Sequence, residues 1–580
     1  MLMTAPLSAL ALLQPSLVSA AALRPLYEKT TTPSNATTAA VNTTICAGNT
    51  YTYRALAGYG FVPGTARDKH GDTLGGLGSS IAIEHGSWKL QPTDNGTALY
   101  TGILWALPDR GWNTNGTLNF TPRVHKLAVS FAPAEAAAAN PNLQLEYLDT
   151  VLFSDPTGAP LTGLDPDASG AIEFPGFPAL PVATYEGDGF GGDGPGGRRV
   201  SLDGEGLVLG ADGSFWVSDE YGPYVYRFSK EGRMVGAIRP PDAYVPQRNG
   251  SQRHVQLFLS PSIELSTLGL HTDPGSFKRE TNTHWLPSFS AASAPIYDPS
   301  RLPVPEDPTS GRANNQGFEG LTLSPDGTTL SVLVQSALMQ DGGAGGKKSR
   351  RHARLLQYDM TSTNASSSSR RQPPTAPKAE YVVPLPTFVN DDGETRVAAQ
   401  SEMLALGATQ FLVLARDSGA GRAAKRTRSL YRHVDVFDVG EATDVVADDV
   451  DSVGGSVVTD AEEGVLADGI APARYCAWLD FNVEGQLARF GLRNGGVDDG
   501  GLLNEKWESL AVVPVLAAPG GEVVEGEWFV ISLSDNDFIT QEGYMDGGRF
   551  EYKDETGASL DNQALVFRVG LERGLKPAGW

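Results

Sequence analysis

A short pattern that recurs four times, far apart in the chain, is the feature that most constrains the fold. In each copy a Glu is followed two residues later by Leu and then by alternating apolar positions, and a turn leads to a second strand-like run with a polar end. The four copies are centred on Glu205, Glu319, Glu402 and Glu508. Because similar units repeated along a chain stack against one another, the pattern indicates a repeat architecture.

The polar ends of the second runs are shared by the copies as well. They are Ser218-Asp219-Glu220, Gln335-Ser336, Arg416-Asp417 and Ser534-Asp535-Asn536-Asp537. A fifth, looser copy starts at Gly75–Ser79, continues in the run Tyr100–Leu107 and ends in Asp109-Arg110-Gly111. The spacings between the four Glu residues, 114, 83 and 106 residues, are too irregular for WD40-type repeats but fit propeller blades with long loop insertions.

Helical periodicity is scarce, and Pro133–Asn140 is the clearest helix-like segment. Strand-like runs recur instead, rich in β-branched or aromatic residues and bounded by turn residues. They are Lys126–Phe131, Gly206–Leu209, Ser214–Ser218, Leu330–Gln335, Phe411–Ala415, Val434–Val439 and Trp528–Leu533. With 67 Gly and 39 Pro available for turns, the chain is predicted to be all-β, a single β-propeller of five to seven blades, six being favoured, with long loop insertions.

A propeller has a direct consequence for the four Glu residues. The innermost strand of each blade lines the central axis, so equivalent residues at the starts of these strands meet in a ring at one mouth. The alternative is that Glu-x-Leu, a common tripeptide, recurs by coincidence. The second strand and the polar end that recur with it favour the ring.

The N-terminal residues are predicted to direct the chain out of the cell. Residues 3–20 are apolar and uncharged and end in the small residues Val18-Ser19-Ala20, so residues 1–20 are expected to be a signal peptide. Residues 21–50 are expected to form a Thr- and Ser-rich glycosylated leader, and residues 51–580 the propeller domain. No later run of apolar residues is long enough for a membrane span.

Asn-x-Ser/Thr sequons predict N-glycosylation at some exposed sites of a secreted chain. They occur at Asn35, Asn42, Asn95, Asn115, Asn119, Asn249 and Asn364. Cysteine use agrees with export, since Cys46 and Cys476 are the only cysteines and an even pair in a secreted chain indicates a disulfide. Such a bond contributes roughly 4–5 kcal/mol in the chain-entropy model. Two separate buried thiols are the alternative.

Several segments are expected to be loops inserted between strands. Gly342–Arg354 and Gly419–Arg428 are basic and rich in glycine, Ser362–Pro377 is rich in Ser and Pro, and Gly440–Asp468 is acidic. These compositions are typical of solvated loops. Residues 239–313 are expected to form a long excursion over one face.

Charge and motifs exclude several classes of function. A net charge of −23 argues against a nucleic-acid partner, which requires a basic face, and suits solubility or cation capture. No Gly-x-Ser-x-Gly, His-Glu-x-x-His or Arg-His-Gly stretch occurs. The nucleophile elbow of α/β-hydrolases, the zinc site of metzincins and the phosphohistidine of histidine acid phosphatases are therefore excluded. Carboxylate chemistry remains, and carboxylate oxygens are the ligands that calcium prefers.

Five segments in a fixed order carry a resemblance to a known family. They are Asp203-Gly-Glu205-Gly-Leu with Asp212-Gly-Ser-Phe-Trp216-Val-Ser-Asp219-Glu220-Tyr221-Gly222-Pro223-Tyr224, Leu107-Pro-Asp109-Arg110-Gly111, Asn315-Gln-Gly-Phe-Glu319-Gly-Leu, Gln400-Ser-Glu402 with Arg416-Asp417, and Trp507-Glu508 with Ser534-Asp535-Asn536-Asp537-Phe538. Over residues 58–570 the chain resembles the phytase-like family, also called the esterase-like activity of phytase family. The resemblance implies a secreted, fungal-type β-propeller that hydrolyses phosphate or carboxylate esters.

A physical mechanism can be attached to these residues as a hypothesis. Calcium would offset the repulsion between the carboxylates and present a positive face to the ester, and a water molecule would be the nucleophile. The proposed calcium ligands are Glu205, Glu319, Glu402, Glu508 and Asp535. The proposed catalytic set is Glu205, Asp219, Glu220, Glu319, Glu402, Arg416, Asp417, Glu508 and Asp537, with Glu220 or Asp537 as general base. Arg110, Arg416 and Tyr221 are the proposed substrate-binding residues.

Two alternatives stay open at this point. The acidic and basic side chains form a buried ion-pair ring that only closes the axis, or the chain is a non-catalytic extracellular propeller that binds a ligand or partner on the same face. The sequence shows no cluster of lysines beside the motifs, which counts against phytate as the substrate. Trp216, Tyr221 and Tyr224 favour a sugar or aromatic ligand, unless they belong to the core. The oligomeric state is not defined by the sequence.

Overall fold

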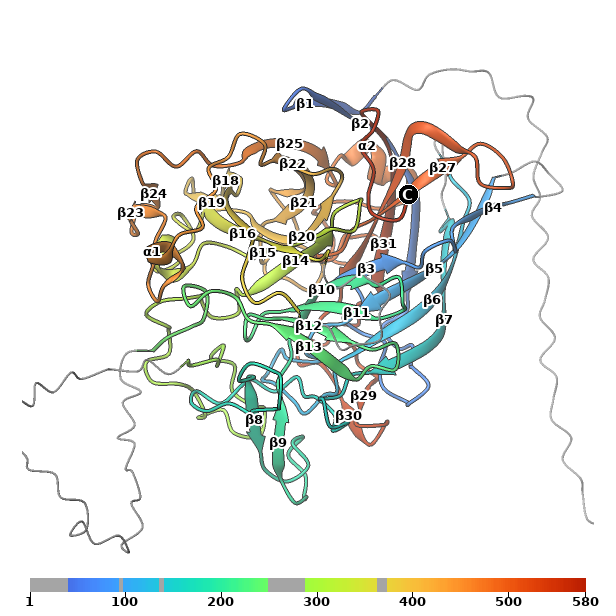
Figure 1. Ribbon diagram of the computed structural model, residues 1–580. Coiled ribbons are helices and arrows are strands. Elements are labelled where there is room, and N and C mark those ends of the chain that lie inside the picture. Colours follow the sequence, from blue (N-terminus) through green and yellow to red (C-terminus); the bar gives the residue numbers. More distant parts are fainter. Residues whose placement is uncertain (1–39, 93–97, 135–139, 249–286, 362–372) are drawn as a thin grey trace, which may run out of the picture. The chain divides into compact units, whose positions relative to one another are not determined.

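Five antiparallel sheets form the computed structural model of this chain, which describes residues 40–580 apart from 93–97, 135–139, 249–286 and 362–372 (Figure 1). We number the sheets as blades 1 to 5. Blade 1 contains β3 (Ser80–Ile83), β4 (Lys89–Gln91), β5 (Leu99–Leu107), β6 (Arg123–Phe131) and β7 (Leu143–Leu152). Blade 2 contains β10 (Gly204–Leu209), β11 (Phe215–Asp219), β12 (Val225–Phe228) and β13 (Met234–Ile238).

The next two blades repeat this simple up-and-down order. Blade 3 contains β14 (Phe318–Leu323), β15 (Thr329–Val334), β16 (His352–Asp359) and β17 (Ala379–Pro384). Blade 4 contains β20 (Ala399–Ala405), β21 (Gln410–Arg416), β22 (Arg432–Asp438) and β25 (Arg474–Asp480). Each strand-like run expected from the sequence overlaps one of the observed strands. The helix expected at Pro133–Asn140 falls largely on 135–139, outside the described residues.

Blade 5 joins strands from both ends of the described chain. It contains β1 (Asn42–Cys46), β2 (Asn49–Val62), β26 (Lys506–Trp507), β27 (Ala511–Leu516), β28 (Val523–Asp535) and β31 (Asn562–Leu571). β2 pairs antiparallel with β31 from Tyr51↔Leu571 to Val62↔Asn562. The all-β propeller is confirmed, and the expected range of five to seven blades includes the observed five. The count is one below the favoured six because the first strands complete the last sheet instead of forming a blade of their own.

A disulfide between Cys46 and Cys476 fastens this closure, as the sequence predicted. Cys46 ends β1 in blade 5 and Cys476 lies in β25 in blade 4, with their Cα atoms 6.0 Å apart and 430 residues between them in sequence. The buried core follows the same arrangement, since each of the largest apolar clusters packs residues of neighbouring blades together. Such packing lets each blade bury both faces.

Short elements connect and decorate the blades. The hairpins are β8 (Val182–Tyr185) with β9 (Gly197–Val200), β18 (Thr387–Val389) with β19 (Thr395–Val397), β23 (Val458–Asp460) with β24 (Val465–Leu466), and β29 (Gly543–Met545) with β30 (Phe550–Tyr552). The helical turns are α1 (Asp448–Asp451), α2 (Glu484–Leu487) and the 3-10 turns η1 (Met339–Asp341) and η2 (Ala488–Phe490). Gly440–Asp468, expected as an unstructured loop, therefore holds α1 and one hairpin.

The inner strands of the five blades, β3, β10, β14, β20 and β27, surround the axis, and four of them are seen side by side in the middle of Figure 1. Glycine permits their close approach. A Cβ on Gly206 would lie 2.6 Å from the Glu319 carbonyl oxygen, and one on Gly320 would lie 2.6 Å from the Met403 Cβ. The Glu-Gly-Leu form of two copies of the repeat thus places neighbouring inner strands in contact at the point where the Glu side chains start.

One end of the axis is apolar. A small cavity of about 110 Å³ there is lined by residues of every inner strand, among them Ile81, Leu207, Leu321, Leu404 and Val512. Pro577, Ala578 and Trp580 from the C-terminal segment also line it. The chemistry of the propeller is therefore concentrated at the opposite end, where the inner strands begin. Among the described residues, no helix is both long and apolar enough to cross a membrane.

Candidate functional site

A cavity of about 1010 Å³ opens where the inner strands begin and the second strands of the blades end. We call it the central pocket. Its lining combines acidic and basic side chains from blades that are distant in sequence. They include Asp109, Arg110, Asp203, Glu205, Lys347, Lys425, Arg426, Glu505, Lys506 and Asp537.

The first acidic group of this end, cluster A, consists of Asp203, Glu205 and Glu220, whose carboxylate oxygens lie within 4.8 Å of one another. All three side chains are buried, and Glu319 from β14 adds a fourth negative charge to their surroundings. Within the described part of the chain, both carboxylate oxygens of Glu220 and the Oε2 atom of Glu319 lack a hydrogen-bond partner. Buried carboxylate oxygens without partners are costly, and a bound cation is one way to satisfy them.

The pKa values of cluster A show the same deficit of positive charge. Burial and the neighbouring Asp203 raise the pKa of Glu220 to about 8. Burial and repulsion from nearby carboxylates hold the pKa values of Glu205 and Glu319 well above their usual range. Arg110 is the nearest counter-charge, with its Nη1 atom 3.1 Å from Asp203 Oδ2. The charges of Arg312 and Lys506 act on this cluster as well, but burial and the mutual repulsion of the carboxylates outweigh them.

A second acidic group, cluster B, consists of Asp109, Asp535 and Asp537. Here a cation is already supplied by the chain, because Lys506 Nζ lies 2.7 Å from Asp537 Oδ1 and 3.4 Å from Asp535 Oδ2. Asp537 and the next residue, Phe538, both adopt left-handed φ angles, of 50° and 55°. Strain of this kind is kept where the surroundings fix a side chain in place, and here it holds Asp537 against Lys506 at the pocket wall.

Glu508 links the two acidic groups to blade 4. Its carboxylate forms an ion pair with Arg416 at the end of β21, and its Oε2 atom lies 3.8 Å from Lys506 Nζ. Although burial acts to raise it, Lys506 and Arg416 hold the pKa of Glu508 below its usual range. Glu508 therefore stays ionised and already has two cationic partners.

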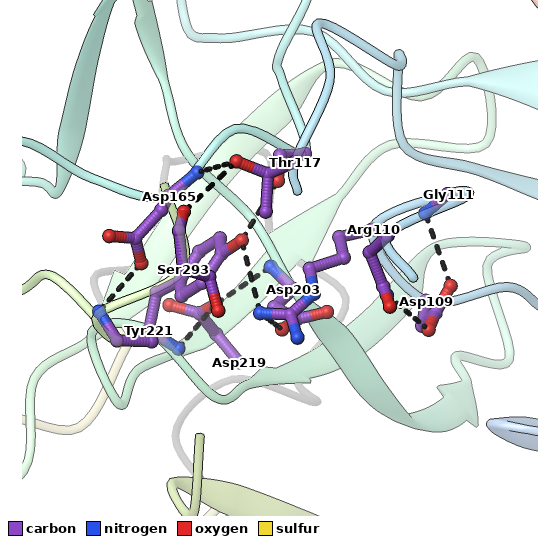
Figure 2. A network of polar contacts seen from close by, with 12 residues as sticks. Asp109, Arg110, Gly111, Thr117, Asp165, Asp203, Asp219, Tyr221 and Ser293 are labelled. Carbon is purple, nitrogen blue, oxygen red and sulfur yellow. Dashed lines mark hydrogen bonds and ion pairs between the residues drawn. The ribbon is translucent and has the colours of Figure 1, made fainter. Parts of the chain in front are cut away.

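Arg110 is held between Asp203 and Tyr221, as Figure 2 shows. The Tyr221 hydroxyl donates to the Gly163 carbonyl oxygen at 2.8 Å, and its ring is fully buried. The guanidinium carbon of Arg110 lies 5.8 Å from the centre of that ring. Tyr221 thus contacts Arg110 and helps to hold it in position, but does not itself line the central pocket.

Two predicted catalytic aspartates turn out to organise loops. Asp219 accepts hydrogen bonds from the backbone N–H groups of Asp203, Tyr221 and Gly222, as Figure 2 shows in part. Asp417 accepts from the Ser429 hydroxyl at 2.6 Å and from the Leu430 N–H at 2.9 Å. Neither side chain lines the central pocket, and both are almost fully buried.

Glu402 is the repeat glutamate that the structure separates from the others. Its carboxylate reaches across the axis to blade 1, where the Ser80 hydroxyl donates to Oε2 at 2.5 Å. Its Oε1 atom accepts from the N–H groups of Met403 and Leu321. Glu402 lines the apolar cavity at the far end of the axis and not the central pocket. Glu402 therefore links blade 4 to blades 1 and 3 by hydrogen bonds across the axis.

The structure therefore brings together four of the five proposed metal ligands, Glu205, Glu319, Glu508 and Asp535, but in two differently balanced groups. Sequence reasoning did not assign roles to Asp109, Asp203 or Lys506. A signal was present, since Asp109 and Asp203 lie in quoted motifs and Lys506 stands two residues before Glu508. Ser79, at the matching position of the fifth copy, takes the place of a Glu and lies 3.5 Å from Asp535.

The expectation that lysines are missing from the site is wrong. Lys347, Lys425 and Lys506 line the central pocket together with Arg426. Lys347 belongs to Gly342–Arg354 and Lys425 to Gly419–Arg428, the two segments expected to be solvated loops. The first is partly buried, with Ser349 and Arg354 at 2% and 0% exposure. Both segments fold back over the mouth of the pocket.

The sequons differ in accessibility. Asn42 and Asn115 are exposed. Asn119 is 5% exposed, and its amide donates to the Asp188 carbonyl oxygen and accepts from Arg199, which leaves no room for a glycan. The sequons at Asn35, Asn95, Asn249 and Asn364 lie outside the described residues.

Residues 96–538, which include both acidic clusters and the arginines beside them, match the family model described as "Phytase-like: Esterase-like activity of phytase". The chain belongs to this family. A relative described as an uncharacterized secreted protein of Arthroderma benhamiae is 51% identical over 516 residues, covering 87% of this chain and 90% of the relative.

Comparison with solved structures gives only remote likenesses to this phytase-like chain. Drosophila Semaphorin 1b, extracellular domains 1-2, aligns with 87% of this chain and 87% of its own at 9% identity and a TM-score of 0.22. Drosophila Plexin A in complex with Semaphorin 1b aligns with 87% of this chain and 88% of its own at 8% identity and a TM-score of 0.20. Scores this low carry no argument about function.

Proposed function

We propose that this chain is a secreted phytase-like hydrolase of phosphate or carboxylate esters, assisted by a divalent cation, with calcium as the favoured ion. Secretion is supported by the predicted signal peptide, the disulfide and the description of the Arthroderma relative as a secreted protein. The observation that carries the proposal is cluster A: Asp203 and Glu205 line a large pocket, and among the described residues the Oδ1 atom of Asp203 and both carboxylate oxygens of Glu220 have no hydrogen-bond partner.

Cluster A fits a hard cation better than cluster B does. Asp203, Glu205 and Glu220 would hold it, with Glu319 beside them, and all their donor atoms are oxygens, which suit calcium or magnesium and not zinc or copper. Cluster B already contains the Lys506 ammonium group. When bound, the cation would supply Lewis-acid polarisation of the ester and would offset the charge of the carboxylates.

The protein's own groups have separable tasks around that point. Lys347, Lys425 and Arg426 attract an anionic substrate to the mouth of the pocket, although the whole chain is strongly acidic. Arg110, locked by Asp203 and Tyr221, donates toward an ester oxygen without having to be ordered first. Fixed positive groups of this kind stabilise the charge that develops in hydrolysis.

Asp537 is the better candidate for the general base. It lines the pocket and is partly exposed, whereas Glu220 is buried behind Glu205 and does not line the pocket. Lys506, at 2.7 Å, orients the Asp537 carboxylate. A carboxylate in that position accepts a proton from a water molecule that attacks the bound ester.

The test is hydrolysis of a panel of phosphate and carboxylate esters by the purified full-length protein, with and without a chelator. Glu205→Gln is expected to lower the rate at least about tenfold, because loss of a carboxylate ligand weakens cation binding. Glu402→Gln is the matched variant, since its carboxylate faces Ser80 and not the pocket, and its rate is expected to equal that of the wild type. Chelator-insensitive hydrolysis, or no hydrolysis of any ester, would contradict the proposal, and the latter result would favour a binding role.

A further inference from the structure

A second, smaller cavity of about 420 Å³ lies between blades 3 and 4. We call it the basic pocket. Its lining contains five cationic side chains, Lys347, Arg350, Arg396, Arg416 and Arg426, and two acidic ones, Asp391 and Asp392. A surplus of positive charge in one cavity stands out in a chain whose formal net charge is −23.

The cations of the basic pocket are not equally balanced. Arg396 pairs with Glu394, Arg416 pairs with Glu508, and Arg426 Nη2 lies 3.7 Å from Asp417 Oδ2. Among the residues that the structure describes, by contrast, no carboxylate forms an ion pair with Lys347 or Arg350. Within that part of the chain, no ion pair balances the positive charge of these two side chains.

Arg350 has the surroundings of a cation that lacks its anion. Its Nε atom donates to the Gly343 carbonyl oxygen at 3.4 Å, a long and weak contact. Burial lowers the pKa of the Arg350 guanidinium, and the charge of Asp307 opposes this only in part. Desolvating a guanidinium without a partner is unfavourable, and an oxyanion in the cavity would relieve that cost.

The segment that carries these two cations is a folded structure. The Ser349 hydroxyl donates to the Gly342 carbonyl oxygen at 2.9 Å, and the Val397 N–H in β19 donates to the Lys347 carbonyl oxygen at 2.9 Å. Gly342 has a φ angle of 118°, and a Cβ there would lie 2.3 Å from the Ser349 carbonyl oxygen. The folded backbone of this segment therefore fixes the positions from which the side chains of Lys347 and Arg350 extend.

Adjacent lysines on this segment have different surroundings. Lys348 pairs with Glu463 at 2.7 Å and lines neither the basic nor the central pocket. Lys347 lines both, and so do Ser418 and Arg426. Gln335 provides a further link, because it lines the basic pocket and its amide donates to Glu319 beside cluster A. The two cavities therefore share lining residues.

We propose that the basic pocket is an anion subsite, in which Lys347 and Arg350 bind a tetrahedral oxyanion, phosphate or sulfate, carried by the part of the substrate that does not react. The inference rests on the proposed function and deepens it, since it makes the preferred substrate an ester with a second, anionic group. Planar guanidinium and mobile ammonium groups together suit such an oxyanion. Asp391 and Asp392 at the rim disfavour bulkier polyanions.

The test is calorimetric titration of inorganic phosphate, and of inorganic sulfate, into the full-length protein kept in chelator, so that no metal at cluster A contributes. Saturable binding of at least one of the two ions is expected. Lys347→Ala and Arg350→Gln are each expected to weaken it at least about tenfold, by loss of a charge-assisted contact. Lys348→Ala is the matched control and is expected to bind like the wild type. Lys347→Arg keeps the charge and is expected to retain most of the affinity.

Absence of binding, or equal weakening by Lys347→Ala and Lys348→Ala, would overturn the proposal. A second comparison uses substrates and the variant Arg350→Gln, since Arg350 lines the basic pocket and not the central pocket. This variant is expected to raise KM for an ester with two phosphate groups and to leave KM for the matching single ester unchanged, and an equal effect on both would also overturn the proposal. The titration does not depend on turnover. If no ester is hydrolysed, the proposed function fails while the subsite can still stand, and if phosphate and sulfate do not bind while hydrolysis persists, only the subsite is lost.

Discussion

Neighbouring carboxyl groups near the propeller axis have different partners, and the partners decide what each can do. Neither oxygen of Glu220 has a hydrogen-bond partner within the described residues. The Asp537 carboxylate pairs with Lys506, and the Asp219 carboxylate accepts hydrogen bonds from backbone N–H groups. The unpartnered oxygens of Glu220 favour cation binding, the position of Asp537 favours a role as general base, and the hydrogen bonds to Asp219 favour a rigid loop. Acidity alone therefore does not define the site.

Asp165 gives a residue-scale prediction on pH, at a buried carboxyl group that is not one of the proposed cation ligands. Burial raises its pKa from 3.8 to about 6, although the Ser290 hydroxyl and the Ala291 N–H donate to it. Because the folded state then binds the proton more tightly than the unfolded state, its contribution to stability is full below the unfolded pKa and is lost as pH rises through about 6.

The variant Asp165→Asn removes that titration while keeping the shape of the side chain. Its melting temperature, relative to that of the wild type, is expected to increase from about pH 4 to about pH 7. Thermal unfolding of both proteins across this range measures the difference. A difference that stays constant or falls with pH would show that Asp165 does not titrate in this way.

The sequence predicted residues well where the backbone alone decides their position. The repeat placed Glu205 and Glu319 at the starts of inner strands, where the structure has them, and Glu508 lies three residues before β27. It misjudged Glu402, because an equivalent backbone position does not determine the side-chain direction, and Ser80 across the axis offers a strong partner. It also overlooked Lys506, whose role depends on Asp537 and Asp535 from another part of the chain.

At the scale of the elements, the glycine that follows the repeat glutamate has no room for a side chain. Gly320 faces Met403 of the next inner strand, and an added Cβ would lie 2.6 Å from its Cβ and 2.7 Å from its backbone nitrogen. Backbone atoms cannot move aside cheaply. Gly320→Ala is expected to lower the free energy of unfolding by roughly 1–3 kcal/mol, as overpacking does in other cores.

Gly485→Ala is the control for that substitution, since a Cβ at Gly485 in α2 meets nothing within 4 Å. It is expected to be neutral or to stabilise by up to about 1 kcal/mol, because alanine favours helix. Urea denaturation of the two variants measures both effects. Equal stabilities would show that the inner strands have room to separate.

The blades could be expected from alternating apolar runs, but their number could not be derived in the same way. Closure depends on the pairing of β2 with β31, whose residues are hundreds of positions apart in sequence and carry no local signal of it. The disulfide was the better long-range indicator, because only one pairing of two cysteines exists. The basic segments were misjudged because their composition says nothing about the folded contacts that Ser349 and Gly342 make.

At the scale of the whole molecule, circular closure is what gathers distant acidic residues into one site. Cluster A joins residues that flank β10 and β11, and Glu319 comes from the next blade. Joining β2 to β31 and Cys46 to Cys476 stabilises the closed form in which these residues stay together. In the proposed function, the carboxylates of cluster A would hold a metal ion, and the cations around the two pockets would attract an anionic ester.

The central claim is that cluster A binds a divalent cation, and calorimetric titration of calcium into chelator-treated protein tests it most directly. The wild type is expected to show one site. Glu220→Gln is expected to weaken it at least about tenfold, because it removes a carboxylate that has no hydrogen-bond partner among the described residues. Asp537→Asn, whose carboxylate pairs with Lys506, is expected to leave the affinity unchanged. No binding by the wild type, or the same affinity in Glu220→Gln, would contradict the account.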